Sequence, residues 1–105
     1  EFATAVQFNV GLVVIVVDNE MYGTIRMHQH KNYKGRYKHT GLINPDFVQL
    51  ANSMGGKGFP VDKTDDFVKT FLEASEWSKK NSLPSLLHVK TGSEMVLPGK
   101  RFDQL

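Results

Sequence analysis

The chain has 105 residues, which allows one domain at most but is long enough to bury a core. A hydrophobic content of 40% and a charged content of 23% argue against wholesale disorder. The net charge of +2 is too small to indicate a nucleic-acid or membrane partner, and the longest apolar run is far too short to span a bilayer. The absence of cysteine excludes disulfides and thiolate metal sites and is consistent with a reducing cytoplasm.

The first half of the chain predicts one buried strand between two short helical segments. Apolar residues within 1–6 share one helix face, and because no capping residue precedes them we expect the chain to be part of something longer. Residues 9–11 predict a turn into a strand over 12–17, whose six consecutive apolar side chains are typical of a central strand buried on both faces. We expect a short helix or turn over 22–30 and a polar, basic and aromatic loop over 31–41.

A strong helix start follows this loop. Asn44-Pro45-Asp46 predicts a helix with Asn44 as its N-cap and Pro45 at its first position, and Gly55-Gly56 ends that helix. Residues 57–61 predict a short strand near a sheet edge, because Pro60 cannot donate a hydrogen bond to a neighbouring strand. The apolar stripe of this helix consists of Phe47, Leu50, Ala51 and Met54. The stripe of the next predicted helix consists of Phe67, Val68, Phe71, Leu72 and Ser75.

The last third of the chain completes an α/β pattern. Residues 64–66 open a helix that ends near 79–81, residues 85–91 predict the last strand, and 92–105 shows no period and is predicted to be a tail or a connection. Strands separated by helices need crossover connections, which predicts an α/β three-layer sandwich with a mostly parallel sheet. Three strands are few for such a fold, so we expect 1–105 to form part of one domain that is incomplete at its N-terminal side.

Side-chain oxygens gather at the carboxyl end of the first strand, where open α/β sheets bind their ligands. Asp18, Asn19 and Glu20 provide them, and hard cations such as Mg²⁺ take amide, carboxylate and backbone carbonyl oxygens together with a substrate phosphate. A helix beginning near Tyr22 would favour an anion at its free N–H groups. The residues therefore suggest a Mg²⁺-diphosphate site, although Asp-Asn after a strand is more often simple turn chemistry.

The same segment resembles a known family. Val13-Val14-Ile15-Val16-Val17-Asp18-Asn19-Glu20-Met21-Tyr22-Gly23-Thr24-Ile25-Arg26 is similar to the carboxyl-terminal, diphosphate-binding domain of thiamine-diphosphate enzymes, in particular of acetolactate synthases and benzoylformate decarboxylases. Residues 1–6, 44–47 and 84–87 are also similar to the corresponding parts of this domain. That family has a two-part signature, Gly-Asp-Gly followed a couple of dozen residues later by Asn-Asn. With eighteen residues before Asn19, the Gly-Asp-Gly half would fall just upstream of Glu1.

The resemblance implies roles for four residues at the cofactor site. Asn19 matches the second Asn of the signature, whose side-chain oxygen binds Mg²⁺, and Met21 matches the residue that gives the metal its backbone carbonyl. Tyr22 and Gly23 match positions where the chain passes the diphosphate and the centre of the cofactor. Asp18 departs from the family, which more often has Asn there, and it could add charge near the metal or merely structure the turn.

The resemblance also implies an activity for the whole enzyme. We expect thiamine diphosphate and Mg²⁺ as cofactors, a 2-oxo acid as substrate and a homodimer or homotetramer as assembly. Decarboxylase, carboligase and oxidase all stay open, as does a flavin requirement. No residue here matches the glutamate that protonates the cofactor in the family, so we assign no catalytic residue and expect this chain alone to be inactive.

Two other features predict binding more weakly. His28, His30 and His39 lack metal-ligand spacing, and the resemblance suggests instead that His28 or Gln29 could touch substrate. Lys31 to Lys38 interleaves basic and aromatic residues, as single-stranded nucleic-acid binders do. The alternative hypotheses are therefore a non-catalytic interaction module that uses Lys31–Lys38, and an inert proteolytic core.

Overall fold

A three-stranded parallel sheet organises the first of two compact units into which the chain divides, made of Glu1–Val17 and Pro45–Lys90. The computed structural model describes the backbone of residues 1–105 and the side chains of 1–94 and 98–105. The strands are β1 (Val13–Asp18), β2 (Lys57–Val61) and β3 (Ser85–Lys90), in the spatial order β1-β3-β2.

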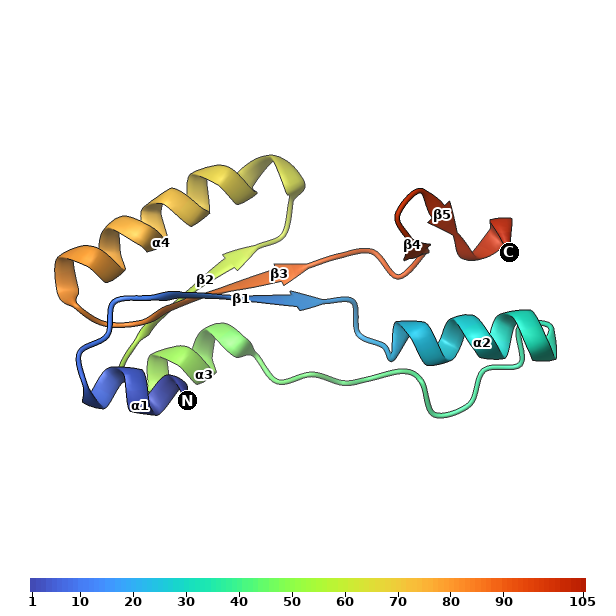
Figure 1. The fold of residues 1–105 in the computed structure, drawn as a ribbon, viewed down its shortest axis with the longest axis horizontal. Coiled ribbons are helices and arrows are strands. Elements are labelled where there is room, and N and C mark those ends of the chain that lie inside the picture. Colours follow the sequence, from blue (N-terminus) through green and yellow to red (C-terminus); the bar gives the residue numbers. More distant parts are fainter. The chain divides into compact units, whose positions relative to one another are not determined.

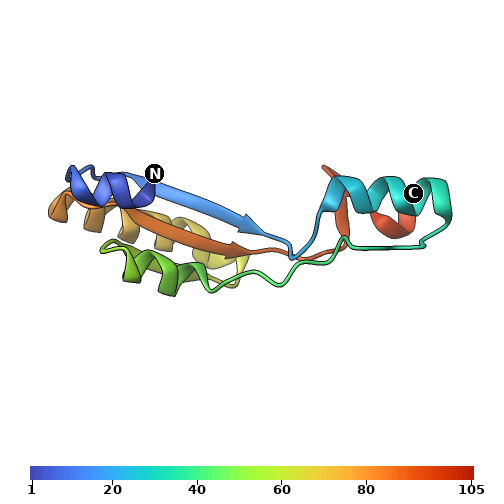
Figure 2. The same cartoon turned by 90° about the horizontal axis from the view of Figure 1, so that it is seen from below.

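Helices cover both faces of this sheet, which confirms the predicted three-layer α/β architecture. Helix α4 (Phe67–Asn81), entered through the short 3₁₀ turn η1 (Thr64–Asp66), lies on one face (Figure 1). Helices α1 (Phe2–Gln7) and α3 (Phe47–Ser53) lie on the other face, in front of the sheet when it is seen from below (Figure 2). As far as β3, the element order agrees with the prediction, except that α4 is preceded by a 3₁₀ turn.

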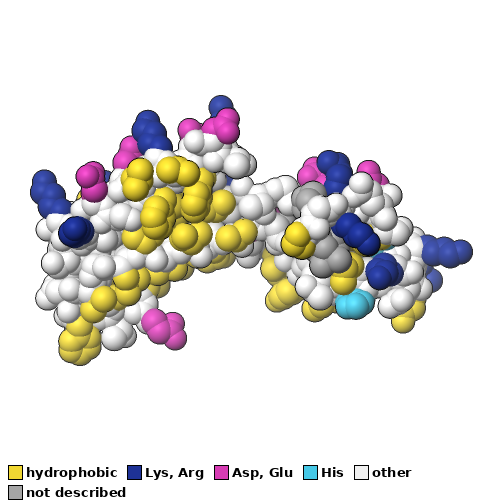
Figure 3. All heavy atoms as spheres, turned by 45° about the horizontal axis from the view of Figure 1, so that its top comes forward, with side chains coloured by type: hydrophobic (Ala, Val, Ile, Leu, Met, Phe, Trp, Pro, Cys, Tyr) yellow, Lys and Arg dark blue, Asp and Glu magenta, His cyan; other side chains and the backbone are white. Residues whose placement is uncertain are grey.

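The core lies between α4 and the sheet. Val61, Ala74 and Leu87 are fully enclosed, and partly buried hydrophobic residues surround them: Val13, Phe59, Phe67, Phe71 and Val89. The apolar stripe predicted for α4 includes two residues that the core does not bury, because Val68 and Leu72 are exposed. Figure 3 shows hydrophobic and charged side chains close together on the surface of this unit. On the opposite side of the sheet, a Cβ at Gly58 would lie 2.5 Å from the Val48 Cα, so glycine lets α3 pack directly on β2.

The prediction that the first strand is central and buried on both faces is wrong for this chain. Strand β1 lies at an edge of the sheet, and the Val17 side chain is 67% exposed. The central strand is β3, where Leu87 has no exposed surface and its neighbours Leu86 and His88 are buried. The predicted edge position of β2 is confirmed.

The predicted N-cap of α3 is also wrong. Asp46 caps this helix, and its Oδ1 accepts hydrogen bonds from Val48 N at 3.0 Å and Gln49 N at 3.2 Å. Both Asn44 and Asp46 are good capping residues, and the helix begins one step after the second of them, at Phe47. Asn44 is left to bond elsewhere.

The second unit consists of Asp18–Asn44 and Thr91–Leu105. Its main element is α2 (Gly23–Tyr33), which runs three residues past the predicted end at His30, so Lys31–Tyr33 is helical rather than part of a loop. Lys34 ends the helix in the left-handed conformation with φ of 50°. Gln29 then fastens the following loop, because its amide exchanges hydrogen bonds with Lys38 N and O at 3.2 and 2.9 Å.

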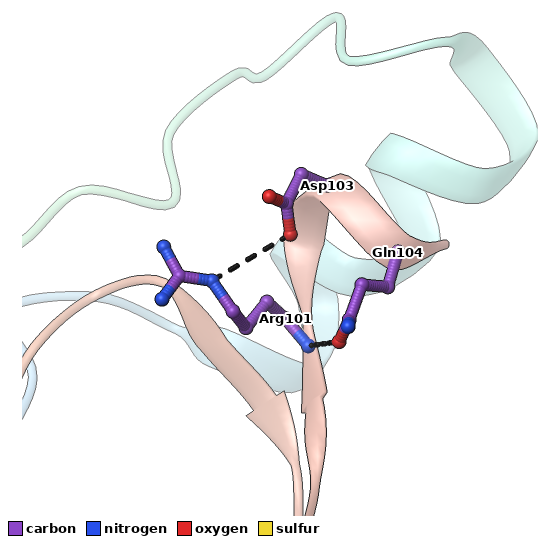
Figure 4. A network of polar contacts seen from close by, with 3 residues as sticks. All are labelled: Arg101, Asp103 and Gln104. Atoms are coloured by element: carbon purple, nitrogen blue, oxygen red, sulfur yellow. Dashed lines mark hydrogen bonds and ion pairs between the residues drawn. The ribbon is translucent and has the colours of Figure 1, made fainter.

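Residues 92–105, predicted to be a tail or a connection, contain two short strands, β4 (Met95–Leu97) and β5 (Lys100–Arg101), and the 3₁₀ turn η2 (Phe102–Gln104). Two contacts of Arg101 stabilise this turn (Figure 4). The Arg101 N donates a hydrogen bond to Gln104 Oε1 at 2.8 Å, and the Arg101 Nε lies 3.6 Å from Asp103 Oδ1. This ion pair is exposed and adds little stability. Among the described residues, no helix combines the length and hydropathy needed to cross a bilayer.

Candidate metal and diphosphate site

The turn after β1 is built around the Asp18 carboxylate. Asp18 is only 6% exposed, and its Oδ1 accepts a hydrogen bond from Glu20 N at 2.9 Å. Its backbone oxygen accepts from Thr91 N at 2.9 Å, which ties the end of β1 to the residue after β3. Glu20 adopts the left-handed conformation with φ of 59°, an uncommon state for a residue with a side chain. The carboxylate therefore serves to shape the turn, which is one of the two roles that the sequence left open for it.

A second side chain binds the same carboxylate oxygen. Asn44 Nδ2 donates to Asp18 Oδ1 at 2.7 Å, across 26 positions of sequence. The sequence missed this role because the order Asn-Pro-Asp predicted Asn44 as a helix cap. The sequence did contain one signal: Asn44 and Asp46 can both cap a helix, and only one of them is needed, so the other can bond elsewhere.

Two short main-chain segments pair directly beside the turn. Tyr22 N donates to Thr40 O and Leu42 N donates to Glu20 O, both at 2.8 Å, on either side of an antiparallel bridge between Met21 and Gly41. In a pair bonded in this way, the N–H and C=O of the bridged residue itself point away from the partner strand. Met21 N donates instead to Asn19 Oδ1, at 3.3 Å. In an extended segment the carbonyl of a residue lies on the same side as its N–H, so the Met21 carbonyl and the Asn19 side-chain oxygen lie on the same side of the backbone.

The first turn of α2 follows these two oxygens. The helix begins at Gly23, with Tyr22 as a half-exposed N-cap, and no described side chain caps it. A Cβ added to Gly23 would lie 3.2 Å from Asn19 Nδ2, so the helix start and the Asn19 amide are in close contact. Uncapped N–H groups and the helix dipole together favour an anion at this point.

The donor set suits a hard cation beside that anion. Asn19 and Met21 offer an amide and a main-chain oxygen, which Mg²⁺ accepts when phosphate oxygens and water complete its octahedron. The Asn19–Met21 hydrogen bond, at 3.3 Å, is longer than a usual N–H···O bond and is therefore weak. Both donors are neutral, and the described residues contain no cluster of three His, Cys, Asp or Glu that could hold a metal. The diphosphate would supply most of the negative charge.

The four predicted cofactor residues, Asn19, Met21, Tyr22 and Gly23, thus lie together in one turn and helix start. The two predicted substrate contacts differ from each other: His28 is exposed, whereas the Gln29 amide is engaged with Lys38 and also accepts from Thr40 Oγ1 at 3.3 Å. Gln29 therefore has a structural task in the loop.

The basic and aromatic segment Lys31–Lys38 offers less stacking surface than its sequence indicates. Tyr37 is partly buried: its hydroxyl lies 2.6 Å from His30 Nδ1, and the Arg26 guanidinium lies 4.1 Å from its ring centroid. Phe102 lies against the same group, with its centroid 5.7 Å from that of His30. Tyr33 is 62% exposed, which leaves one aromatic ring of the segment for a partner. This arrangement gives the interaction-module hypothesis no specific support.

The fold and this turn define a parallel α/β domain with a candidate ligand site at the carboxyl end of a strand. Residues 1–89 match the family described as the C-terminal TPP binding domain of thiamine pyrophosphate enzymes. The chain belongs to this family, as its resemblance to thiamine-diphosphate enzymes predicted.

Relatives agree with this assignment, and a solved structure has the same fold. The chain is 39% identical over 99 residues to the mitochondrial acetolactate synthase catalytic subunit of Aspergillus candidus. The match covers 93% of this chain and 14% of that protein. The corresponding subunit of Saccharomyces cerevisiae is 38% identical over 102 residues, with the same coverage. Benzoylformate decarboxylase from Polynucleobacter necessarius superposes with a TM-score of 0.73 over 90% of this chain and 17% of its own, at 22% identity, which shows the shared fold. The chain thus spans about a seventh of the length of the curated relatives it matches.

Proposed function

We propose that this chain anchors the diphosphate of thiamine diphosphate through Mg²⁺ in an acetolactate-synthase-like enzyme that acts on 2-oxo acids. The observation that carries the proposal is the turn at 19–23, where the Asn19 Oδ1 and the Met21 carbonyl lie on one side of the backbone and the start of α2, which no described side chain caps, follows them. The family and the relatives named above support it.

Each group of the turn has a distinct task in this proposal. Asn19 and Met21 give the metal two neutral oxygens, while the N–H groups at the start of α2 and the backbone at Tyr22 and Gly23 receive the diphosphate. When bound, thiamine diphosphate supplies the carbanion chemistry, and the protein fixes its position and orientation. Decarboxylation or carboligation of a 2-oxo acid is the reaction class that this similarity favours.

The remaining machinery would come from outside this chain. None of its residues is assigned a catalytic role, and a further metal ligand is needed because two neutral oxygens do not hold Mg²⁺ alone. We therefore propose that the isolated chain is inactive and that the complete enzyme is a homodimer or homotetramer. The cytoplasm stays the predicted location, although both fungal relatives are named as mitochondrial.

The test is the cofactor affinity of the full-length protein that carries this chain, measured by titration calorimetry with and without Mg²⁺. We expect thiamine diphosphate to bind only with Mg²⁺ and the substitution Asn19→Ala to abolish that binding. Asn32→Ala, the same change at an exposed position of α2, is the matched control and should bind as wild type. Unchanged affinity in Asn19→Ala would refute the proposed function.

A further inference from the structure

We propose that Asn44 is a positioning residue for the metal-binding turn, and that it acts through Asp18. This inference rests on the proposed function, because it assigns Asn44 a role toward the same Mg²⁺-diphosphate site. Asn44 itself donates no group to the metal; it holds the carboxylate that gives the turn its shape. The residue lies outside the 19–23 segment that the sequence predicted as the site.

The first step of the argument is the sharing of one oxygen atom. Asp18 Oδ1 accepts from Asn44 Nδ2 at 2.7 Å and from Glu20 N at 2.9 Å. A buried carboxylate keeps its place through such hydrogen bonds, and the Asn44 bond is the shorter of the two. If Asn44 is lost, Oδ1 loses the shorter of these two bonds, and the Glu20 bond is no longer supported from the 40–44 segment.

The second step is the backbone that this oxygen stabilises. Glu20 has φ of 59°, which a residue with a side chain adopts only when its surroundings require it. Glu20 stands between Asn19 and Met21, so a change in its backbone moves the amide oxygen and the carbonyl oxygen relative to each other. Mg²⁺ needs near-ideal octahedral geometry at short distances, which makes it sensitive to such a shift.

The third step is the position of Asn44 along its own segment. Residues 40–42 already pair with 20–22 through two main-chain hydrogen bonds. Asn44 follows two residues later and extends this attachment from the middle of the turn to the end of β1. The segment 40–44 therefore holds the turn at both ends, by main-chain bonds on one side and by the Asn44 side chain on the other.

An exchange of the two side chains tests this role. Asn44→Asp places a second carboxylate against Asp18 and should raise the Mg²⁺ dissociation constant, measured at a fixed thiamine diphosphate concentration, by about tenfold, the lower end of the cost of losing groups that orient metal ligands. Asp18→Asn keeps an oxygen that accepts the same two hydrogen bonds, and it serves as the reference for the double variant. The double variant Asp18→Asn/Asn44→Asp restores a donor–acceptor pair and should bind Mg²⁺ more tightly than Asn44→Asp and about as tightly as Asp18→Asn.

Calorimetry on the full-length protein gives these constants, and thermal unfolding without cofactor separates them from stability. A purely structural role would lower the melting temperature and leave the Mg²⁺ constant of the folded protein unchanged, which would overturn the proposal. The same holds if the double variant is no better than Asn44→Asp. If Asn44→Asp does not fold, Asn44→Ala removes the hydrogen bond without adding charge. Unchanged Mg²⁺ affinity of Asn44→Ala would also overturn the proposal.

Failure of this inference can be told from failure of the proposed function. If Asn19→Ala loses the cofactor while Asn44 variants bind normally, the metal site stands and the positioning role of Asn44 is wrong. If wild type needs no Mg²⁺, or Asn19→Ala binds as wild type, the site itself is wrong.

Discussion

Gly23→Ala is predicted to separate cofactor binding from stability, because its two effects have opposite signs. Gly23 is the first residue of α2 and has no positive φ, so alanine fits the backbone and is the better helix former, by up to about 1 kcal/mol in a helix interior. The added Cβ would lie 3.2 Å from Asn19 Nδ2, tighter than ordinary contact. The Asn19 amide has to move by a few tenths of an ångström, and its oxygen moves with it.

A shift of that size changes little in the fold but matters for Mg²⁺, whose ligands lie close and in fixed directions. We expect the free energy of unfolding to stay unchanged or to rise slightly, and Mg²⁺-dependent binding of thiamine diphosphate to weaken by about tenfold, or about 1.4 kcal/mol. Chemical denaturation of the cofactor-free protein and calorimetry of the full-length protein measure the two effects.

Gly41→Ala is the matched control. Gly41 is the bridge partner of Met21, yet a Cβ there meets no atom within 4 Å, so binding should not change. The reasoning fails if Gly23→Ala binds the cofactor as wild type does, or if Gly41→Ala loses as much affinity. It also fails if Gly23→Ala weakens binding only because the protein unfolds.

Two further predictions concern the scaffold. Leu87→Ala, at a side chain with no exposed surface in the central strand, should lower the free energy of unfolding by about 2–5 kcal/mol, and a loss below about 1 kcal/mol in urea denaturation would show that β3 is not the core strand. Asp46→Ala should cost about 1 kcal/mol by removing both cap hydrogen bonds of α3, while Gln49→Ala, an exposed position of the same helix, should cost far less; equal losses in the same assay would show that Asp46 is not the cap.

Local patterns predicted most of the elements but not their neighbours. The runs of apolar residues at strand and helix spacing located β1, β2, β3, α3 and α4, because that spacing depends on local burial. The order of strands in the sheet depends on contacts between distant segments. The apolar run of β1 therefore could not show that β3, rather than β1, occupies the centre.

The same distinction applies to the site. Asn19, Met21, Tyr22 and Gly23 are consecutive or nearly so, and a resemblance over one segment was enough to select them. Asn44 and Thr91 reach the turn from 26 and 73 positions away from Asp18, and no local pattern marks such contacts. The end of α2 shows a smaller failure of the same kind: Lys31–Tyr33 is polar enough for a loop, yet the helix continues until the left-handed Lys34.

The division of labour between Asp18 and Asn19 has a consequence for how the proposed site would work. Asp18 is buried and accepts hydrogen bonds within the protein, while Asn19, a neutral residue, is the one that we propose as a ligand of the metal. Two neutral oxygens attract a divalent cation weakly, whereas a diphosphate adds both charge and ligands. Metal and cofactor should therefore bind together rather than one after the other. In this arrangement the Asp18 carboxylate fixes the backbone at 19–21, so the protein would set the geometry of the metal site. The diphosphate would in turn supply most of the affinity for the metal.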